Sequence, residues 1–171
     1  LTLAEGIRGV GGDPARLAEA KRSDIAAFLE LHIEQGPVLE AGRLDVGIVT
    51  AIAGITRVEI VVAGRADHAG TTPMTARADA LVAASELVIA IERLALERSL
   101  GEAHFAATVG EFSILPGAAN VVPSSARLLI DARAERRPDM EAFLADLAHL
   151  VADVAGRRGV AAKRAPDDTD R

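Results

Sequence analysis

Two histidine-bearing segments hold the residue types in this chain that are best suited to chemistry. His32 lies in Leu31-His32-Ile33-Glu34-Gln35-Gly36, and His68 lies in Asp67-His68-Ala69-Gly70-Thr71-Thr72-Pro73-Met74. In each segment a titratable side chain stands beside a turn, and rigidly positioned turns carry functional residues disproportionately often. Asn120 and Arg133 form a third polar group farther along the chain.

His32 is a candidate metal ligand, because a neutral imidazole binds zinc well and carboxylates commonly share such sites. Residues 25–35 alternate in a strand-like pattern that places Glu30, His32 and Glu34 on one face, just before Gly36-Pro37. The alternative is an ordinary solvent-exposed strand face, which the local pattern by itself favours. Further ligands would have to come from elsewhere.

His68 precedes Thr72-Pro73, which is a good N-cap followed by a favoured first helical residue. A helix beginning there would offer backbone N–H groups and a positive dipole end to an anion. His68 beside such a site would hydrogen-bond a carboxylate or a developing oxyanion. The alternative, a surface histidine that helps to cap the helix, stays open.

Asn120 follows the Pro116-Gly117 turn. The alternative to a functional role for Asn120 is ordinary turn chemistry, which is a common role of asparagine. Arg133 ends a predicted strand that carries Asp131 two residues earlier on the same face. Arg133 is therefore either one half of an ion pair or a guanidinium fork for a substrate carboxylate.

The elements that must position these residues fall into two groups. Before residue 53 the pattern predicts short helices and extended runs, at 3–10, 14–22, 25–35, 37–40 and 43–53. After it the pattern predicts strand, helix, two strands, helix and strand, at 55–63, 72–98, 105–115, 121–133, 138–158 and 160–163. This β-α-β-β-α-β order is the split-βαβ, ferredoxin-like arrangement, an α+β two-layer sandwich with both helices on one face of an antiparallel sheet.

Composition narrows the classes of partner. The net charge of −6 and the aromatic content of 2% argue against a nucleic-acid partner, which needs clustered Lys and Arg or stacking rings. The chain has no cysteine, so disulfides and thiolate metal sites are excluded. No apolar run reaches membrane-spanning length without charges. We expect a protein with no membrane partner and, by default, a cytoplasmic location.

Three motifs extend this interpretation. They are Leu31-His32-Ile33-Glu34-Gln35-Gly36-Pro37, the run Gly64–Met74 continued by Arg77-Ala78-Asp79-Ala80, and Pro116-Gly117 through Asn120-Val121-Val122-Pro123 to Asp131-Ala132-Arg133. From about residue 24 to 135 the chain resembles the N-carbamoyl-L-amino-acid hydrolase, β-ureidopropionase and allantoate amidohydrolase group of the M20 family of metallo-amidohydrolases and peptidases.

The resemblance implies a role for each candidate. His32 would bind one of two divalent ions, zinc or manganese in the first place, and Gln35 would line the substrate pocket. His68, Asn120 and Arg133 would lie on a lid that closes over the substrate. Arg133 would grip its carboxylate, and His68 would help to stabilise the tetrahedral intermediate, with the neighbouring subunit's site as one possibility. The lid would also make the homodimer.

The resemblance further implies two segments, a partial catalytic-domain segment at 1–52 and a lid or dimerisation domain at 53–170. The family's other metal ligands and its general-base glutamate have no matching segment here, so we expect an incomplete centre that is inactive alone. The interpretation also expects His32 to line a shared cleft, and His68 and Arg133 to lie on the same side of the lid. The alternative class is a non-catalytic split-βαβ module that dimerises or binds small carboxylates.

Overall fold

The structure, a computed structural model, describes residues 2–164. The chain divides into two compact units, Leu1–Ile48 and Val49–Arg171, and each is described by itself. The predicted assignment of 1–52 to a catalytic domain and 53–170 to a lid remains a prediction.

The first unit holds three short helices, all at the predicted places. They are α1 (Leu3–Gly9), the 3₁₀ helix η1 (Pro14–Ala20) and α2 (Val38–Gly42). Asp13 begins η1, where its side chain accepts a hydrogen bond from the N–H of Ala15. None of the three helices has a buried residue.

The strand predicted at 25–35 is wrong for the structure as described, because the segment lacks strand pairing, and the extended run predicted at 43–53 is unpaired as far as Ala53. Period-two alternation predicts which side chains share a face, but a strand also needs a neighbour to accept and donate its backbone hydrogen bonds. Phe28 and Leu31 are 81% and 96% exposed, so the apolar residues that suggested a strand are not covered within this unit.

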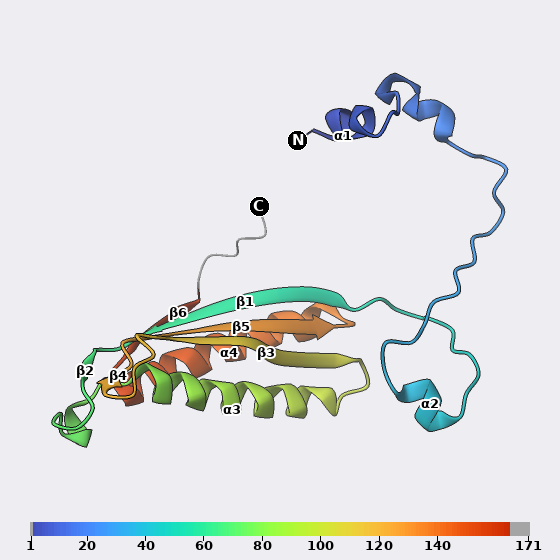
Figure 1. Cartoon of the computed structure of the whole chain (residues 1–171). Helices are drawn as coiled ribbons and strands as arrows, with labels where there is room; N and C mark the ends of the chain where they lie inside the picture. The colour runs from blue at the N-terminus through green and yellow to red at the C-terminus, as the bar shows by residue number, and fades with distance from the viewer. Residues whose placement is uncertain (1, 165–171) are drawn as a thin grey trace. The chain divides into compact units, whose positions relative to one another are not determined.

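The second unit is built on a four-stranded antiparallel sheet (Figure 1). Its strands lie in the order β3-β5-β1-β6, which are Phe105–Leu115, Ser125–Ala134, Gly54–Ala63 and Ala161–Arg164. β5 and β1 are central, and β3 is a long edge strand. With one helix after β1 and one after β5, this arrangement confirms the predicted split-βαβ fold.

The predicted strand at 121–133 is two strands. β4 (Val121–Val122) pairs with β2 (Asp67–His68) in a small antiparallel ribbon, and β5 begins at Ser125. Pro123 separates them, because proline has no N–H to continue a ladder.

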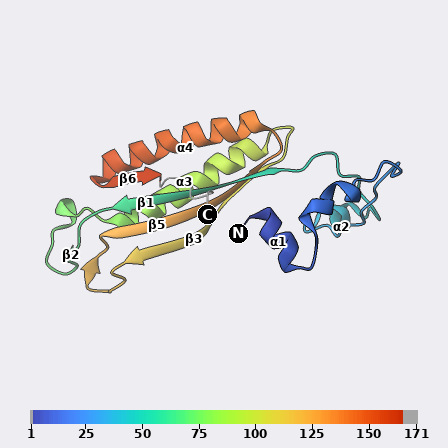
Figure 2. The ribbon, with the colours of Figure 1, turned by 90° about the horizontal axis from the view of Figure 1, so that it is seen from above.

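Both long helices, α3 (Ala80–Ser99) and α4 (Arg137–Arg158), cover the same face of the sheet, and no α-helix among the described residues of this unit covers the other face (Figures 1 and 2). α4 begins beside Pro138, as predicted, and ends at Gly159, where φ is +63°. Only a residue without Cβ adopts that left-handed conformation readily, so the glycine stops the helix.

The prediction that Thr72-Pro73 opens α3 is wrong. Pro73 is extended, with φ −55° and ψ 142°, and a single 3₁₀ turn, η2 (Met74–Ala76), follows it. α3 begins at Ala80, where the Asp79 carboxylate accepts the N–H groups of Leu81 and Val82. Thr and Asp are both good N-caps, and the choice depends on how the preceding loop is anchored, which a local pattern does not contain.

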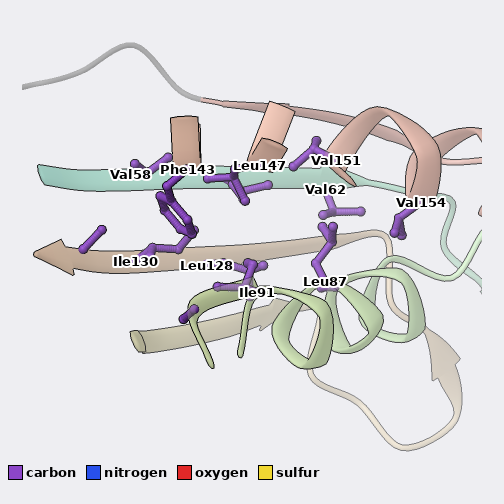
Figure 3. Close-up of a cluster of buried hydrophobic side chains, with 14 of the residues drawn as sticks. Val58, Val62, Leu87, Ile91, Leu128, Ile130, Phe143, Leu147, Val151 and Val154 are labelled. Atoms are coloured by element: carbon purple, nitrogen blue, oxygen red, sulfur yellow. The ribbon is translucent and has the colours of Figure 1, made fainter. Parts of the chain in front are cut away.

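The core lies between the sheet and the two helices, and Figure 3 shows its large side chains pointing toward one another. β1 and β5 contribute alternate apolar residues, as their period-two pattern predicts. Apolar residues at helical spacing predict a stripe on α4 of Met140, Phe143, Leu144, Leu147, Val151 and Val154, and all of these are buried except Leu144, which packs partly buried against the core. The two phenylalanine rings of Phe105 and Phe143 pack with centroids 5.1 Å apart.

The buried face of α3 agrees only in part with the apolar stripe that the sequence predicts, because Ile91 is fully buried while Val88 and Leu94 pack at the margin of the core. Its buried residues are mostly alanines, namely Ala80, Ala83, Ala84, Leu87, Ile91 and Ala95. Apolar residues at helical spacing in this segment, Leu81, Val88, Ile91 and Leu94, predict a stripe of larger side chains, of which only Ile91 is fully buried. Alanines let a helix backbone approach the sheet closely, and their small size makes them weak signals in a hydrophobic pattern.

Ion pairs join the two helices on their outer side. Glu86 of α3 contacts Arg157 at 2.5 Å and Arg158 at 2.6 Å, and Arg98 pairs with Asp146. Hydrogen bonds from Arg157 and then Arg158 hold the pKa of Glu86 below its ordinary value, despite some burial.

Candidate functional site

The sequence-predicted site residues of the second unit fall into two clusters at opposite ends of the sheet. The ribbon cluster consists of His68, Gly70 and Asn120 on and beside the β2–β4 ribbon. The strand-end cluster consists of Arg57, Asp131 and Arg133 on the open face of the sheet, near the other end.

The loop from Gly64 to Asp79 presents the ribbon cluster, and two arginines organise it. Arg65 pairs with the Asp67 carboxylate at 2.8 Å and donates to the Ala76 carbonyl. Arg77 donates to the carbonyls of Ala69 and Thr72. Each guanidinium therefore ties one side of the loop to the other, which holds β2 in place without a large apolar core.

Gly64 marks the point where this loop closes on itself. A Cβ on Gly64 would lie 2.1 Å from the carbonyl oxygen of Ala78, so no other residue fits without moving the backbone. The N–H of Arg65 donates to the same carbonyl at 2.8 Å. The close approach fixes the loop that carries His68 immediately ahead of α3.

His68 pairs with Val121 across the ribbon and is exposed. Its carbonyl accepts the N–H groups of Thr71 and Thr72, and its Nδ1 accepts the N–H of Gly70 at 3.0 Å. The expected anion site at a helix N-terminus is wrong, because α3 starts at Ala80 and Asp79 already caps it. His68 caps no helix either; it orders its own turn and leaves Nε2 without a partner among residues 2–164.

Asn120 lies next to His68 in the ribbon. Its backbone carbonyl accepts the N–H of Ala69 at 2.9 Å, which accounts for the main-chain part of its turn role. The side-chain amide is exposed and makes no hydrogen bond within the described part of the chain. An unengaged amide beside an unengaged imidazole nitrogen can offer a donor and an acceptor to a small polar ligand.

Arg133 forms the predicted ion pair with Asp131, with Nε 2.8 Å from Oδ1. Arg57 lies 3.7 Å from the second oxygen of the same carboxylate. Hydrogen bonding from Arg133 holds the pKa of Asp131 below its ordinary value, and the nearby Arg57 adds to this effect. Only Nε of Arg133 is engaged, so its two terminal nitrogens, unbonded within residues 2–164, still form a fork that can hold a carboxylate.

One chain cannot bring the two clusters to one small ligand. Arg133 lies eight residues along β5 from Ser125, at the ribbon end, and a strand rises about 3.3 Å per residue, so the two are about 26 Å apart. That span far exceeds the length of a small amino-acid derivative. His68 and Arg133 of one chain therefore lie too far apart to hold the same small ligand, and the expectation that they lie on the same side of the lid stays a prediction.

His32, Glu34 and Gln35 lie in the first unit, and all three are exposed. The Glu34 carboxylate accepts the N–H groups of Val38 and Leu39, so it caps α2. His32 Nδ1 lies 2.8 Å from the Ile33 carbonyl, which can only accept. Nδ1 is then the protonated nitrogen, and the Nε2 lone pair fits a divalent metal. Whether His32 and Gln35 join a site stays a prediction.

A single imidazole does not make a metal centre. Across residues 2–164, no group of three or more His, Cys, Asp or Glu side chains is placed to hold a metal ion. A catalytic zinc site needs three protein ligands, so this chain supplies at most part of one.

Sequence reasoning missed the residues that support the candidates. It gave no role to Arg65, Arg77 or Gly70, and it did not expect Arg57 to share Asp131 with Arg133. The spacing of His68 and Gly70, two residues apart, is compatible with a side chain that accepts a backbone N–H two residues on, and this was a usable signal. The arginine contacts to loop carbonyls have no local signature.

The fold and these clusters define a two-layer α+β domain that carries polar groups at both ends of an open-faced sheet. The family described as "Peptidase dimerisation domain" (M20_dimer) matches residues 50–158. The chain therefore belongs to the M20 peptidase dimerisation domain family.

Named relatives agree with this family. The chain is 38% identical to an N-carbamoyl-L-amino-acid amidohydrolase of Paenarthrobacter aurescens, over 95% of this chain and 39% of the relative. It is 38% identical to an allantoate amidohydrolase of Bacillus subtilis, over 84% of this chain and 34% of the relative. The chain thus spans little more than a third of their lengths.

A solved structure gives the same result in three dimensions. An amidase of the hydantoinase/carbamoylase family from Burkholderia multivorans superimposes with a TM-score of 0.73 and 36% identity, covering 78% of this chain and 32% of that one. Within residues 2–164, no helix is both long and apolar enough to cross a lipid bilayer.

Proposed function

We propose that this chain is the lid and dimerisation part, with one metal-binding segment, of an amidohydrolase that uses two divalent ions. The substrates would be N-carbamoyl amino acids or allantoate-like ureido acids, cleaved at the carbamoyl or ureido C–N bond. The observation that carries the proposal is the separation of two ligand-type clusters at opposite ends of a domain of a dimerisation family.

A two-fold axis would bring the separated clusters together. Phe105 of β3 pairs with Ala134, beside Arg133, whereas Leu115 of β3 pairs with Ser125, at the ribbon end. If β3 pairs antiparallel with β3 of a second copy, the Phe105 end of each copy lies against the Leu115 end of the other. The strand-end cluster of one copy would then face the ribbon cluster of the other, twice per dimer.

The surface beside β3 suits such pairing. β3 is an edge strand of eleven residues, with one side open within the described part of the chain. Val82, Ile89 and Leu96 of α3 are 43%, 52% and 60% exposed, and their spacing of seven places them on one stripe. Ile89 also lines a groove between α3 and β3 with Val109. An open edge next to an apolar stripe is a common basis for a homodimer.

Each cluster would then have a distinct task. The Arg133 fork would bind the substrate carboxylate, and Asn120 would hydrogen-bond the ligand's polar groups from the second copy. His68 would donate to the scissile carbonyl oxygen as negative charge develops there. Closure of the lid would complete this set of contacts and exclude water.

His32 would hold one of the divalent ions through Nε2, and Gln35 would line the pocket beside it. When bound, the two ions would polarise the scissile carbonyl and favour ionisation of the attacking water. The remaining ligands and the general-base glutamate would come from residues outside this chain, so the 171 residues alone would be inactive.

The test compares these 171 residues with the whole protein that contains them. Metal content and release of amine from an N-carbamoyl amino acid are measured for both. Hydrolysis by the whole protein, with none by the 171-residue chain, is the expected result. Absence of hydrolysis in both, together with carboxylate binding or dimerisation by the chain alone, would instead favour the non-catalytic module.

A further inference from the structure

His68 has one engaged and one unengaged ring nitrogen, and the partner of the engaged nitrogen is a main-chain donor. The N–H of Gly70 lies 3.0 Å from Nδ1. An N–H can only donate, so Nδ1 must carry the lone pair. In the neutral ring the single proton then sits on Nε2.

Three successive backbone N–H groups converge on this residue. Gly70 donates to the ring, while Thr71 and Thr72 donate to the carbonyl of His68 at 3.4 and 3.1 Å. On the other side of the residue, pairing of His68 with Val121 of β4 fixes its place in the ribbon. The turn thus holds the backbone and the ring of His68 in one arrangement.

Residue 70 has to be small for this contact. A Cβ on Gly70 would lie 3.2 Å from Cε1 and 3.5 Å from Nδ1 of His68, which is tighter than ordinary contact at the first atom. The φ angle of Gly70 lies outside the left-handed region, so the ring, not the backbone, is what a side chain would disturb.

We propose that the backbone N–H of Gly70 is a positioning group that fixes His68 as the Nε2–H tautomer, so that Nε2 presents a hydrogen-bond donor to a carbonyl oxygen of the substrate. The catalytic part of this inference rests on the proposed function; the tautomer does not. The opposite tautomer would present a lone pair to the developing oxyanion and repel it. The same turn that builds the ribbon therefore also selects what the imidazole can do.

The tautomer is read by NMR on the ¹⁵N-labelled 171-residue chain, at a pH at which the imidazoles are neutral. Long-range ¹H–¹⁵N spectra report which ring nitrogen is protonated, and His68→Gln assigns the signals. We expect an unprotonated Nδ1, a protonated Nε2 and a scalar coupling between Gly70 ¹⁵N and Nδ1 across the hydrogen bond. A protonated Nδ1, or no coupling, overturns the proposal.

Gly70→Ala tests the cause. The added Cβ should push the ring away, abolish the coupling and shift the tautomer ratio toward that of His104 and His149, whose rings have no partner within residues 2–164. Gly156→Ala is the matched control, since nothing lies within 4 Å of a Cβ there. An unchanged His68 signature in Gly70→Ala contradicts the inference.

In the whole protein, Gly70→Ala should lower kcat about 100-fold, the usual loss for one oxyanion donor, with little change in KM. KM should stay nearly the same because Arg133, which this substitution does not touch, binds the substrate carboxylate. An unchanged kcat, with the tautomer confirmed by NMR, would overturn the catalytic role of His68 and leave the tautomer assignment standing.

Discussion

The separation of the two clusters leads to a quantitative prediction about mixed dimers of the whole protein. His68→Ala removes the ribbon donor and Arg133→Ala removes the carboxylate fork, so each homodimer should be almost inactive. If each site uses Arg133 of one subunit and His68 of the other, a mixed dimer contains one fully intact site and one that lacks both groups.

The size of the recovery follows from random exchange of subunits. Equal amounts of the two variants give about half mixed dimers, and each of these has one working site out of two, so total activity should return to about one quarter of wild type. A site built within one chain would give no recovery, and the about 26 Å along β5 makes that arrangement unsuitable for a small substrate.

The assay is amine release from an N-carbamoyl amino acid after the variants have been mixed, with native mass spectrometry to count mixed dimers. Asn120→Ala provides the matched controls, because Asn120 belongs to the ribbon cluster with His68. It should complement Arg133→Ala but not His68→Ala. Mixed dimers that form and yet show no more activity than the parent variants would refute the two-fold arrangement.

Four further predictions concern assembly, core, pH and metal. Ile89→Asp should weaken dimerisation of the 171-residue chain by sedimentation, whereas Ala145→Asp on the exposed side of α4 should not; equal effects would contradict the α3 surface. Phe143→Ala, at a fully buried site, should cost about 3–5 kcal/mol in urea unfolding; a loss below about 1 kcal/mol would show a loosely packed core. The pKa of Glu86 is lowered in the folded state, so its contribution, under about 1 kcal/mol, is present above the ordinary carboxyl pKa and is lost as pH falls through the folded value. The melting temperature of wild type should therefore fall more steeply with acid than that of Glu86→Gln, and parallel curves would contradict the ion pair. Calorimetry with Zn²⁺ should show no tight two-metal binding to the 171-residue chain, and His32→Ala should change little; two tight sites would refute the inferred division of ligands.

The core-facing sides of β1, β5 and α4 could be predicted because the signals are local. Alternation along β1 and β5, and apolar residues at helical spacing from Met140 to Val154, state directly which side faces the core. The buried face and the first residue of α3 were harder to predict. The buried face is mostly alanine, and the first residue depends on a loop anchored by Gly64 and Arg77. Those contacts join residues whose spacing follows no repeating pattern.

The candidate residues could be chosen from motifs, but their grouping could not. His68 and Asn120 are far apart in sequence and adjacent in space, whereas Asn120 and Arg133 are close in sequence and distant in space. The direction of β5 decides both facts, and only the sheet topology fixes that direction. The tautomer of His68 likewise depends on one backbone N–H that a motif does not reveal.

The two outer strands of the sheet have consequences for how large an assembly can grow. β6 is an edge strand of only four residues and carries Lys163 and Arg164. A short, charged edge strand is a poor site for another strand to pair with. β3 is long and open on one side within residues 2–164, and the proposed pairing with β3 of a second copy would occupy that side. If two copies pair through β3 as proposed, residues 2–164 offer no second long open strand, and we expect assembly to stop at two chains instead of continuing into a fibre.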